Sequence, residues 1–152
     1  MAMPIDISHL MKLSQAGLDD LFRNSPAGDI PIGDTEGAAI FWPGTVLEAP
    51  TAKIVRWIFW QGKVFDPAKG GLLNKILPFG IKAIPARVYK DKSWFDGREC
   101  ITLDYSRSSV LVRSIRDEIR LVAPGVYLGI VFLGKRKLIG FALKFPDPKP
   151  EV

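Results

Sequence analysis

The chain has 152 residues, of which 47% are hydrophobic and 24% charged. These values are typical of a globular domain with a sizeable core, and they exclude a disordered or low-complexity chain. The net charge of +5 and the pI near 9.4 would suit an acidic partner. The basic residues are scattered, however, and no nucleic-acid-binding signature occurs, so we expect no nucleic-acid partner. We expect one domain over residues 1–152, with loose tails at 1–7 and 146–152.

The chain holds one cysteine, Cys100, and one histidine, His9. A lone cysteine forms no internal disulfide, which favours a reducing, cytoplasmic location. The chain start lacks the basic and apolar regions of a secretory signal, and every apolar run is shorter than the ~20 residues of a membrane span. Zinc sites draw several ligands from histidine and cysteine. We therefore expect no metal, and no glycine-rich cofactor fingerprint occurs either.

The first half of the chain is predicted to contain one clear helix. Leucines recur at helical spacing from Ser8 to Asn24, with Ser8 as the expected N-cap. A first strand is expected near Ala38–Trp42. The stretch Thr51–Trp60 fits a helix or a buried strand, and we favour the helix. Lys63–Phe65 is expected to form a short strand.

The second half is predicted to consist of strands joined by short turns. Alternating residues indicate strands at Ile81–Lys90, where Pro85 suggests a sheet edge or a bulge, and at Arg98–Ser106. Val110–Val122 exceeds a typical strand and is expected to bend near Ser114–Asp117. The last two strands, Val126–Leu133 and Leu138–Phe145, should form a hairpin over the turn at residues 134–137.

This order of elements predicts a mainly β protein with a minor α+β character. Successive strands with short turns pair antiparallel. Val126–Leu133 is apolar on both faces, which a half-exposed flat sheet would not require. We therefore expect an antiparallel β-barrel or a strongly curved sheet, with an N-terminal helix and one or two further short helices.

The segment IRDEIRLV, from Ile115 to Val122, places charges among aliphatic residues. In one interpretation, Arg116, Glu118 and Arg120 form a solvated face and compensate one another. The second interpretation concerns Asp117, which shares its face of the strand with isoleucine and leucine. A carboxylate there costs several kcal/mol unless it is paired or protonated. It would then be either bonded to an arginine, such as Arg113, or functional.

A second cluster is aromatic and surrounds the stretch WIFWQGKVFDPAKGGLLNKILPFG. Most of these rings should be core. Rings around one cavity would also suit an apolar ligand with a polar end, or the lysines beside them could meet an anionic membrane. The candidate ligand-binding residues are Trp57, Trp60, Lys63, Phe65, Tyr89, Arg113 and Tyr127.

Several ordered stretches of the chain resemble a known family. They are LDDLFRNSP, GDTEG, WQGKVF, LDYS, IRDEIRLV, YLG and FALKF, and they span most of the sequence. The set resembles the bacterial proteins of unknown function that are named for a GXWXG motif, although Thr35 stands where that motif has tryptophan. The resemblance implies a lipocalin-like, ligand-holding β-structure, and it singles out Trp60, Gly62, Lys63, Tyr105, Asp117 and Arg120.

Three functions remain open at this point. The first is the binding of an apolar or amphipathic molecule, such as a fatty acid, polyketide or terpenoid, inside the barrel, with Lys63 or Arg120 at its polar end. The second is a cofactor-independent isomerase, cyclase or hydrolase in the same cavity, with Asp117 as acid or base, Tyr105 as hydrogen-bond donor and Arg120 as anion stabiliser. The third is a peripheral membrane or assembly module. A homodimer is compatible with each.

Overall fold

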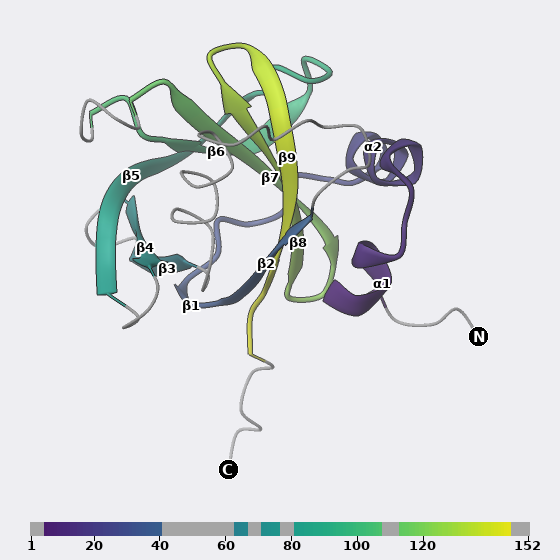
Figure 1. Cartoon of the computed structure of the whole chain (residues 1–152), viewed down its shortest axis with the longest axis horizontal. Coiled ribbons are helices and arrows are strands. Elements are labelled where there is room, and N and C mark those ends of the chain that lie inside the picture. Colours follow the sequence, from purple (N-terminus) through teal and green to yellow (C-terminus); the bar gives the residue numbers. More distant parts are fainter. Residues whose placement is uncertain (1–4, 41–62, 67–70, 77–80, 108–112, 147–152) are drawn as a thin grey trace, which may run out of the picture.

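The computed structural model describes residues 5–40, 63–66, 71–76, 81–107 and 113–146 (Figure 1). Within them the chain forms a strongly curved, mainly β structure with two N-terminal helices, which confirms the predicted fold class. The predicted helix at Thr51–Trp60 and the terminal stretches 1–4 and 147–152 lie outside the described residues. The helices are α1 (Ile7–Met11) and α2 (Gln15–Asn24). The strands are β1 (Gly33–Asp34), β2 (Glu36–Ile40), β3 (Lys63–Asp66), β4 (Gly71–Ile76), β5 (Ile81–Lys92), β6 (Glu99–Asp104), β7 (Ile115–Ala123), β8 (Val126–Leu133) and β9 (Arg136–Lys144).

All strand pairs that the structure describes are antiparallel, in the order β1-β3-β4-β5-β6-β7-β8-β9-β2. Short connections between β3 and β9 explain this order, because consecutive strands joined by short turns become neighbours. The two outermost strands, β1 and β2, are separated in sequence by Thr35 alone. One chain segment therefore reaches both edges of the sheet, which requires the sheet to curve strongly (Figure 1).

The N-terminal helix is broken into two, where the leucine spacing predicted one. Asp6, and not Ser8, caps α1 by accepting a hydrogen bond from the His9 amide at 2.8 Å. Ser14 then caps α2 by accepting one from the Gly17 amide at 3.0 Å. A serine that satisfies a free amide in this way starts a new helix more readily than it continues an old one. The predicted loose tail at 1–7 is also wrong for Ile5 and Ile7, which pack against the core.

Of two predicted strand irregularities, one lies where it was expected and the other does not. The expected bulge at Pro85 is confirmed, since the β4–β5 register shifts between Leu73 and Asn74, opposite Pro85 and Ala83. The bend expected near Ser114–Asp117 lies instead at the other end of β7, between Leu121 and Ala123. The interior strand therefore stays regular through its charged segment, and its side chains alternate strictly between the two faces.

The predicted C-terminal hairpin is confirmed, with a tighter turn than expected. Leu133 pairs with Arg136, so only Gly134 and Lys135 form the turn, and Gly134 has a φ of 59°. A two-residue turn with positive φ matches the twist of the flanking strands. Within this hairpin Gly129 lies opposite Phe141, whose ring occupies the space where a side chain of residue 129 would begin.

The curved sheet buries apolar side chains on both faces. The inner face carries one cluster, to which Ile101, Leu103, Ile119, Val131 and Ile139 contribute. The outer face of β8 and β9 is covered by α1 and α2, whose Leu10, Leu18 and Phe22 pack on Leu128 and Ile130 (Figure 1). This two-sided burial explains why β8 is apolar throughout.

The segment after α2 covers one end of the inner face. The Leu121 amide donates to the Pro26 carbonyl at 3.0 Å, and the Tyr127 hydroxyl donates to the Asp29 carbonyl at 2.7 Å. Gly28 has a φ of 73°, and a Cβ there would lie 2.6 Å from Leu121 Cβ. A glycine is thus needed for the chain to pass this close to β7.

Candidate functional site

Strand β7 is buried on both faces, although it carries four charged residues, three of them in succession. The expectation of a solvated face is wrong: Arg116 is 9% exposed, and Glu118 and Arg120 are 0% exposed. The reason is that α2 and the loop between β5 and β6 lie over that face. Asp117 is also 0% exposed and points to the inner face, as its place among aliphatic residues predicted.

On the inner face, Asp117 forms a hydrogen bond with Tyr105. The Tyr105 hydroxyl donates to Asp117 Oδ2 at 3.2 Å, and both side chains are fully buried. Their neighbours belong to the apolar inner cluster, including Leu103, which pairs with Asp117 across the sheet. This pair can hold or move a proton in a dry environment, and it can offer a polar end to a bound molecule.

On the outer face, Glu118 is held by a different set of groups. Its carboxylate accepts hydrogen bonds from the Ser93 hydroxyl and, at 2.7 Å, from the Trp94 amide. The Arg116 guanidinium pairs with it at 3.1 Å. These donors satisfy the buried carboxylate, which fixes the β5–β6 loop on β7.

Arg120 has a structural role on the same outer face. Its guanidinium forms two hydrogen bonds with Asp96, at 2.6 and 2.7 Å, and one with the Phe22 carbonyl at 2.9 Å. It also stacks on the Phe22 ring at 4.4 Å. Arg120 thus joins α2, the β5–β6 loop and β7, and the structure does not bring it together with Asp117 or Tyr105.

The Arg120 ion pair changes the acidity of Asp96. Hydrogen bonding to Arg120 lowers the pKa of Asp96 from 3.8 to about 2, against the opposing effect of burial. The planar, bidentate geometry explains the strength of the effect. Asp96 therefore remains ionised in the folded protein at any pH near neutrality.

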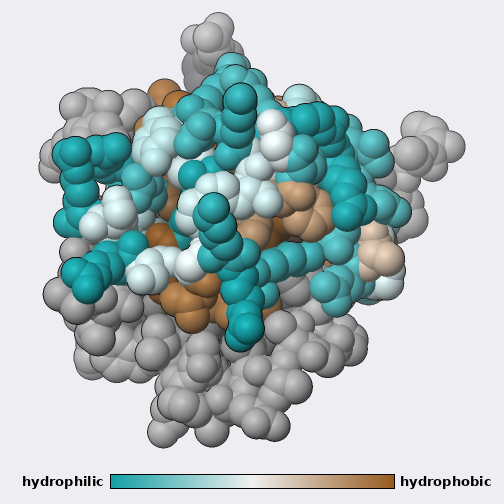
Figure 2. Space-filling view, turned by 90° about the horizontal axis from the view of Figure 1, so that it is seen from above, coloured by the Kyte–Doolittle hydropathy of each residue, from teal (hydrophilic) through white to brown (hydrophobic). Residues whose placement is uncertain are grey.

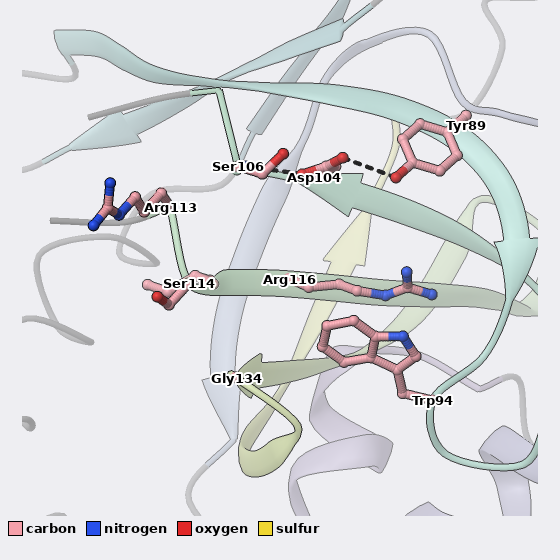
Figure 3. Close-up of a pocket in the computed structure, with 9 residues that line it drawn as sticks. Tyr89, Trp94, Asp104, Ser106, Arg113, Ser114, Arg116 and Gly134 are labelled. Atoms are coloured by element: carbon pink, nitrogen blue, oxygen red, sulfur yellow. Dashed lines mark hydrogen bonds between the residues drawn. The ribbon is translucent and has the colours of Figure 1, made fainter. Parts of the chain in front are cut away.

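The outer face also holds a pocket of about 340 Å³, at the end of the sheet where the β8–β9 turn lies (Figure 3). Trp94, from the β5–β6 loop, is 43% exposed at its wall. The Arg116 guanidinium stacks on the indole at 4.4 Å. The lining residues are Tyr89, Trp94, Asp104, Ser106, Arg113, Ser114, Ile115, Arg116 and Gly134.

Tyr89 and Asp104 form the upper wall of this pocket. The Tyr89 hydroxyl donates to Asp104 Oδ2 at 2.8 Å, and the Ser106 amide donates to Oδ1 at 2.8 Å (Figure 3). Burial raises the pKa of Asp104, but the hydrogen bonds from Ser106 and Tyr89 and the charge of Arg87 outweigh this effect, and the pKa is lowered overall. Burial and the bond to Asp104 raise the pKa of Tyr89. The pair therefore consists of an ionised carboxylate and a neutral phenol.

The remaining predicted site residues fall into separate places. Phe65 and Tyr127 belong to the inner cluster, and both rings contact Phe145, at centroid distances of 5.6 and 5.5 Å. Arg113 is exposed and lines the outer pocket, so it is not the partner of Asp117. Trp57, Trp60 and the side chain of Lys63 lie outside the described residues, as does most of the proposed membrane-facing stretch.

Two functional features were not predicted from the sequence. Trp94 was not singled out, yet it is half-exposed at a pocket, and Glu118 was not expected to hold a loop. The signal for the loop was local: Ser93 and Asp96 are turn-forming residues that can bond to the backbone or to a nearby charge. Among the described residues no cluster of histidine, cysteine, aspartate or glutamate could hold a metal ion.

Comparisons with known proteins give the fold and no activity. No family model and no curated protein matches the chain. The crystal structure of a protein from Thermomonospora curvata is similar, with a TM-score of 0.57, 15% identity and 88% of each chain covered. None of the helices that the structure describes is long and apolar enough to span a bilayer. The chain thus shares the architecture of the Thermomonospora curvata protein over most of its length.

Proposed function

We propose that the inner face of the curved sheet binds an apolar or amphipathic small molecule of the fatty acid, polyketide or terpenoid type. The observation that carries the proposal is the Tyr105–Asp117 hydrogen bond, at 3.2 Å, between two fully buried side chains. A carboxyl group inside an apolar cluster costs several kcal/mol relative to water. A ligand with a polar end that meets this pair gives a reason for retaining it.

The surroundings of the pair support an apolar ligand. The inner cluster contains isoleucine, leucine and valine from β6 to β9, and the rings of Phe65, Tyr127 and Phe145 lie at one end. Such surfaces supply affinity through the area they remove from water, at about 25 cal/mol per Å² before the entropic losses of binding. The lipocalin-like character implied by the family resemblance remains a prediction that agrees with this role.

The alternative is a cofactor-independent enzyme that uses the same pair. A hydrogen-bonded phenol and carboxyl in a dry site can exchange a proton with a bound substrate. Arg120, expected to stabilise an anion there, lies on the opposite face of β7, so this alternative depends on Tyr105 and Asp117 alone. A cytoplasmic location belongs to either proposal, since the single cysteine requires no oxidising compartment. Membrane association and a homodimer remain predictions.

The test is binding of a fluorescent fatty acid to Tyr105→Phe and to a matched control, Tyr89→Phe. Both variants remove one hydroxyl that donates to an aspartate, but Tyr105 lies inside the sheet and Tyr89 outside. We expect Tyr105→Phe to weaken binding about tenfold, or about 1.4 kcal/mol, and Tyr89→Phe to leave it unchanged. Failure of the wild-type protein to bind the probe, or equal effects of the two substitutions, would refute the proposal. Native mass spectrometry of the purified protein should show a co-purifying ligand.

A further inference from the structure

The outer pocket is a second site, independent of the inner face. Its volume of about 340 Å³ lies within the ~300–1,000 Å³ typical of small-molecule sites. It lies on the outer face of β5–β7, whereas Tyr105 and Asp117 belong to the inner face. Its chemistry is mixed, with one exposed ring, two serine hydroxyls and charged groups at its rim (Figure 3).

Basic residues lie in the lining of the pocket and directly after lining residues in the sequence. Arg113 lines the pocket, Arg107 follows the lining residue Ser106, and Lys135 and Arg136 follow the lining residue Gly134. All four basic side chains are exposed, and within the described part of the chain none of them forms an ion pair or a side-chain hydrogen bond. Figure 2, seen from the top of Figure 1, shows hydrophilic side chains over most of the described part of this end. The charge of Arg113 in the lining favours an anion, and the neighbouring basic residues raise the local positive potential.

The wall of the pocket offers an aromatic surface to a ligand. Trp94 is 43% exposed, while Arg116 stacks on its ring and Phe132 meets it edge-on, at a centroid distance of 5.7 Å. These contacts hold the indole in place, and its exposed area can contact a planar ring. Arg113 and Trp94 lie on opposite sides of the group of residues drawn in Figure 3. A ligand that reaches both would have a ring at one end and an anionic group at the other.

We propose that this pocket binds a phosphate monoester that carries a planar ring. The ring lies against Trp94, and the phosphate lies at the rim with Arg113, since a guanidinium group matches phosphate oxygens in geometry. A dianionic phosphate responds more strongly to the local positive potential than a singly charged carboxylate does. The one acidic lining residue, Asp104, is already engaged by Tyr89, Ser106 and Arg87, and it lies on the Tyr89 side of the pocket.

The test measures calorimetric binding of four probes at low salt: adenosine 5′-monophosphate, phenyl phosphate, inorganic phosphate and adenosine. We expect each of the two ring-bearing phosphates to bind at least about tenfold more tightly than inorganic phosphate or adenosine. Amide resonances of Ser106 and Gly134 should shift on saturation. Equal affinity of inorganic phosphate and the ring-bearing phosphates would overturn the proposal, as would the absence of saturable binding below about 1 mM.

A matched pair of double variants separates a site from general charge attraction. Arg113→Gln/Arg136→Gln removes the arginine at the rim and one exposed cation beside the β8–β9 turn, and Lys12→Gln/Lys144→Gln removes two exposed cations elsewhere, on the end of α1 and at the end of β9 away from the turn. All four side chains are exposed, so both proteins should fold. We expect the rim variant to weaken binding at least about tenfold and the control to change it less than about twofold. Equal weakening by the two double variants would show non-specific attraction and overturn the proposal.

Discussion

Asp117 and Glu118 are neighbours on β7, and their fully buried carboxyl groups lie on opposite faces of the sheet. Asp117 bonds to a tyrosine hydroxyl in the inner apolar cluster, whereas Glu118 bonds to an arginine, a serine and a backbone amide under the β5–β6 loop. The alternation of side chains along a strand separates the two acids. Two adjacent acids thus lie in different surroundings, one in the apolar inner cluster and the other against the β5–β6 loop.

Substitution of Glu118 by glutamine should destabilise the protein strongly. The change leaves the shape nearly intact but removes the charge that pairs with the buried Arg116, whose guanidinium lies 3.1 Å away. Breaking a buried ion pair from one side costs about 3–5 kcal/mol. We expect a loss in this range in the free energy of unfolding, measured with urea. The control is Glu99→Gln, an exposed acid on β6, which should stay within about 0.5 kcal/mol of the wild type.

Stability should fall between pH 4 and pH 2 through Asp96. Its pKa is lowered to about 2 in the folded protein, from 3.8, chiefly by the hydrogen bonds from Arg120. Because the folded pKa is below the unfolded one, the ion pair contributes its full stability above pH 4 and loses it as the pH drops to about 2. At 1.36 kcal/mol per pKa unit, the contribution is about 2 kcal/mol.

Urea unfolding at pH 6 and pH 2.5 measures this contribution. Asp96→Asn should be less stable than the wild type at pH 6, and the difference should shrink at pH 2.5, where the wild-type carboxylate becomes partly protonated. Asp20→Asn, at an exposed ion pair with Arg23, serves as the control and should show little effect at either pH. A constant difference between Asp96→Asn and the wild type would contradict the assignment.

The sequence predicts the strands well because their signals are local. Alternation and turn residues locate β6, β8 and β9, and the helical spacing of leucines locates α2, although the boundary at Ser14 depends on one side-chain hydrogen bond. The inward direction of Asp117 follows from the same alternation. Such features need only the neighbouring residues of the chain.

The sequence does not reveal which distant segments of the chain cover each face of the sheet. The alternation shows that Glu118 and Arg120 share a face. The same pattern is compatible with a face exposed to solvent and with a face covered by other parts of the protein. The outcome depends on the Arg120 contact with Phe22, 98 residues away, and on the β5–β6 loop. The pocket beside Trp94 likewise joins β5, β6, β7 and the β8–β9 turn, and no single segment encodes it.

Cys100 should be inert in the folded protein. It is fully buried, and burial raises the pKa of its thiol to about 12, with a further contribution from the charge of Glu118. The thiolate is the reactive form, so a thiol reagent at pH 8 should label the native protein only on the timescale of unfolding. In urea above the unfolding midpoint, one equivalent should react rapidly. Rapid labelling of the native protein would show that the loop over β6 opens readily.

Substitution of Gly129 by alanine should disrupt the β8–β9 hairpin. The new methyl group would overlap the ring of Phe141, which lies directly opposite and is 2% exposed. The ring belongs to the buried inner cluster, and overpacking of this kind costs about 1–3 kcal/mol. We expect a loss in this range in the free energy of unfolding.

A second substitution tests the cause of that loss. Phe141→Leu alone should destabilise the protein, because it leaves a cavity over Gly129. In the double variant, the alanine methyl group enters that cavity. The loss in the free energy of unfolding should therefore be clearly smaller than the sum of the two single losses, with a coupling of about 1 kcal/mol or more. Gly97→Ala is a poor control, because Gly97 has a φ of 77° that alanine rarely adopts. The control is Ala142→Gly, which changes the same hairpin at a residue paired with Leu128 on the outer face, without touching the ring. The loss of stability from Ala142→Gly should simply add to the loss from Phe141→Leu. If the losses from Gly129→Ala and Phe141→Leu also added, the ring would be ruled out as the source of the strain.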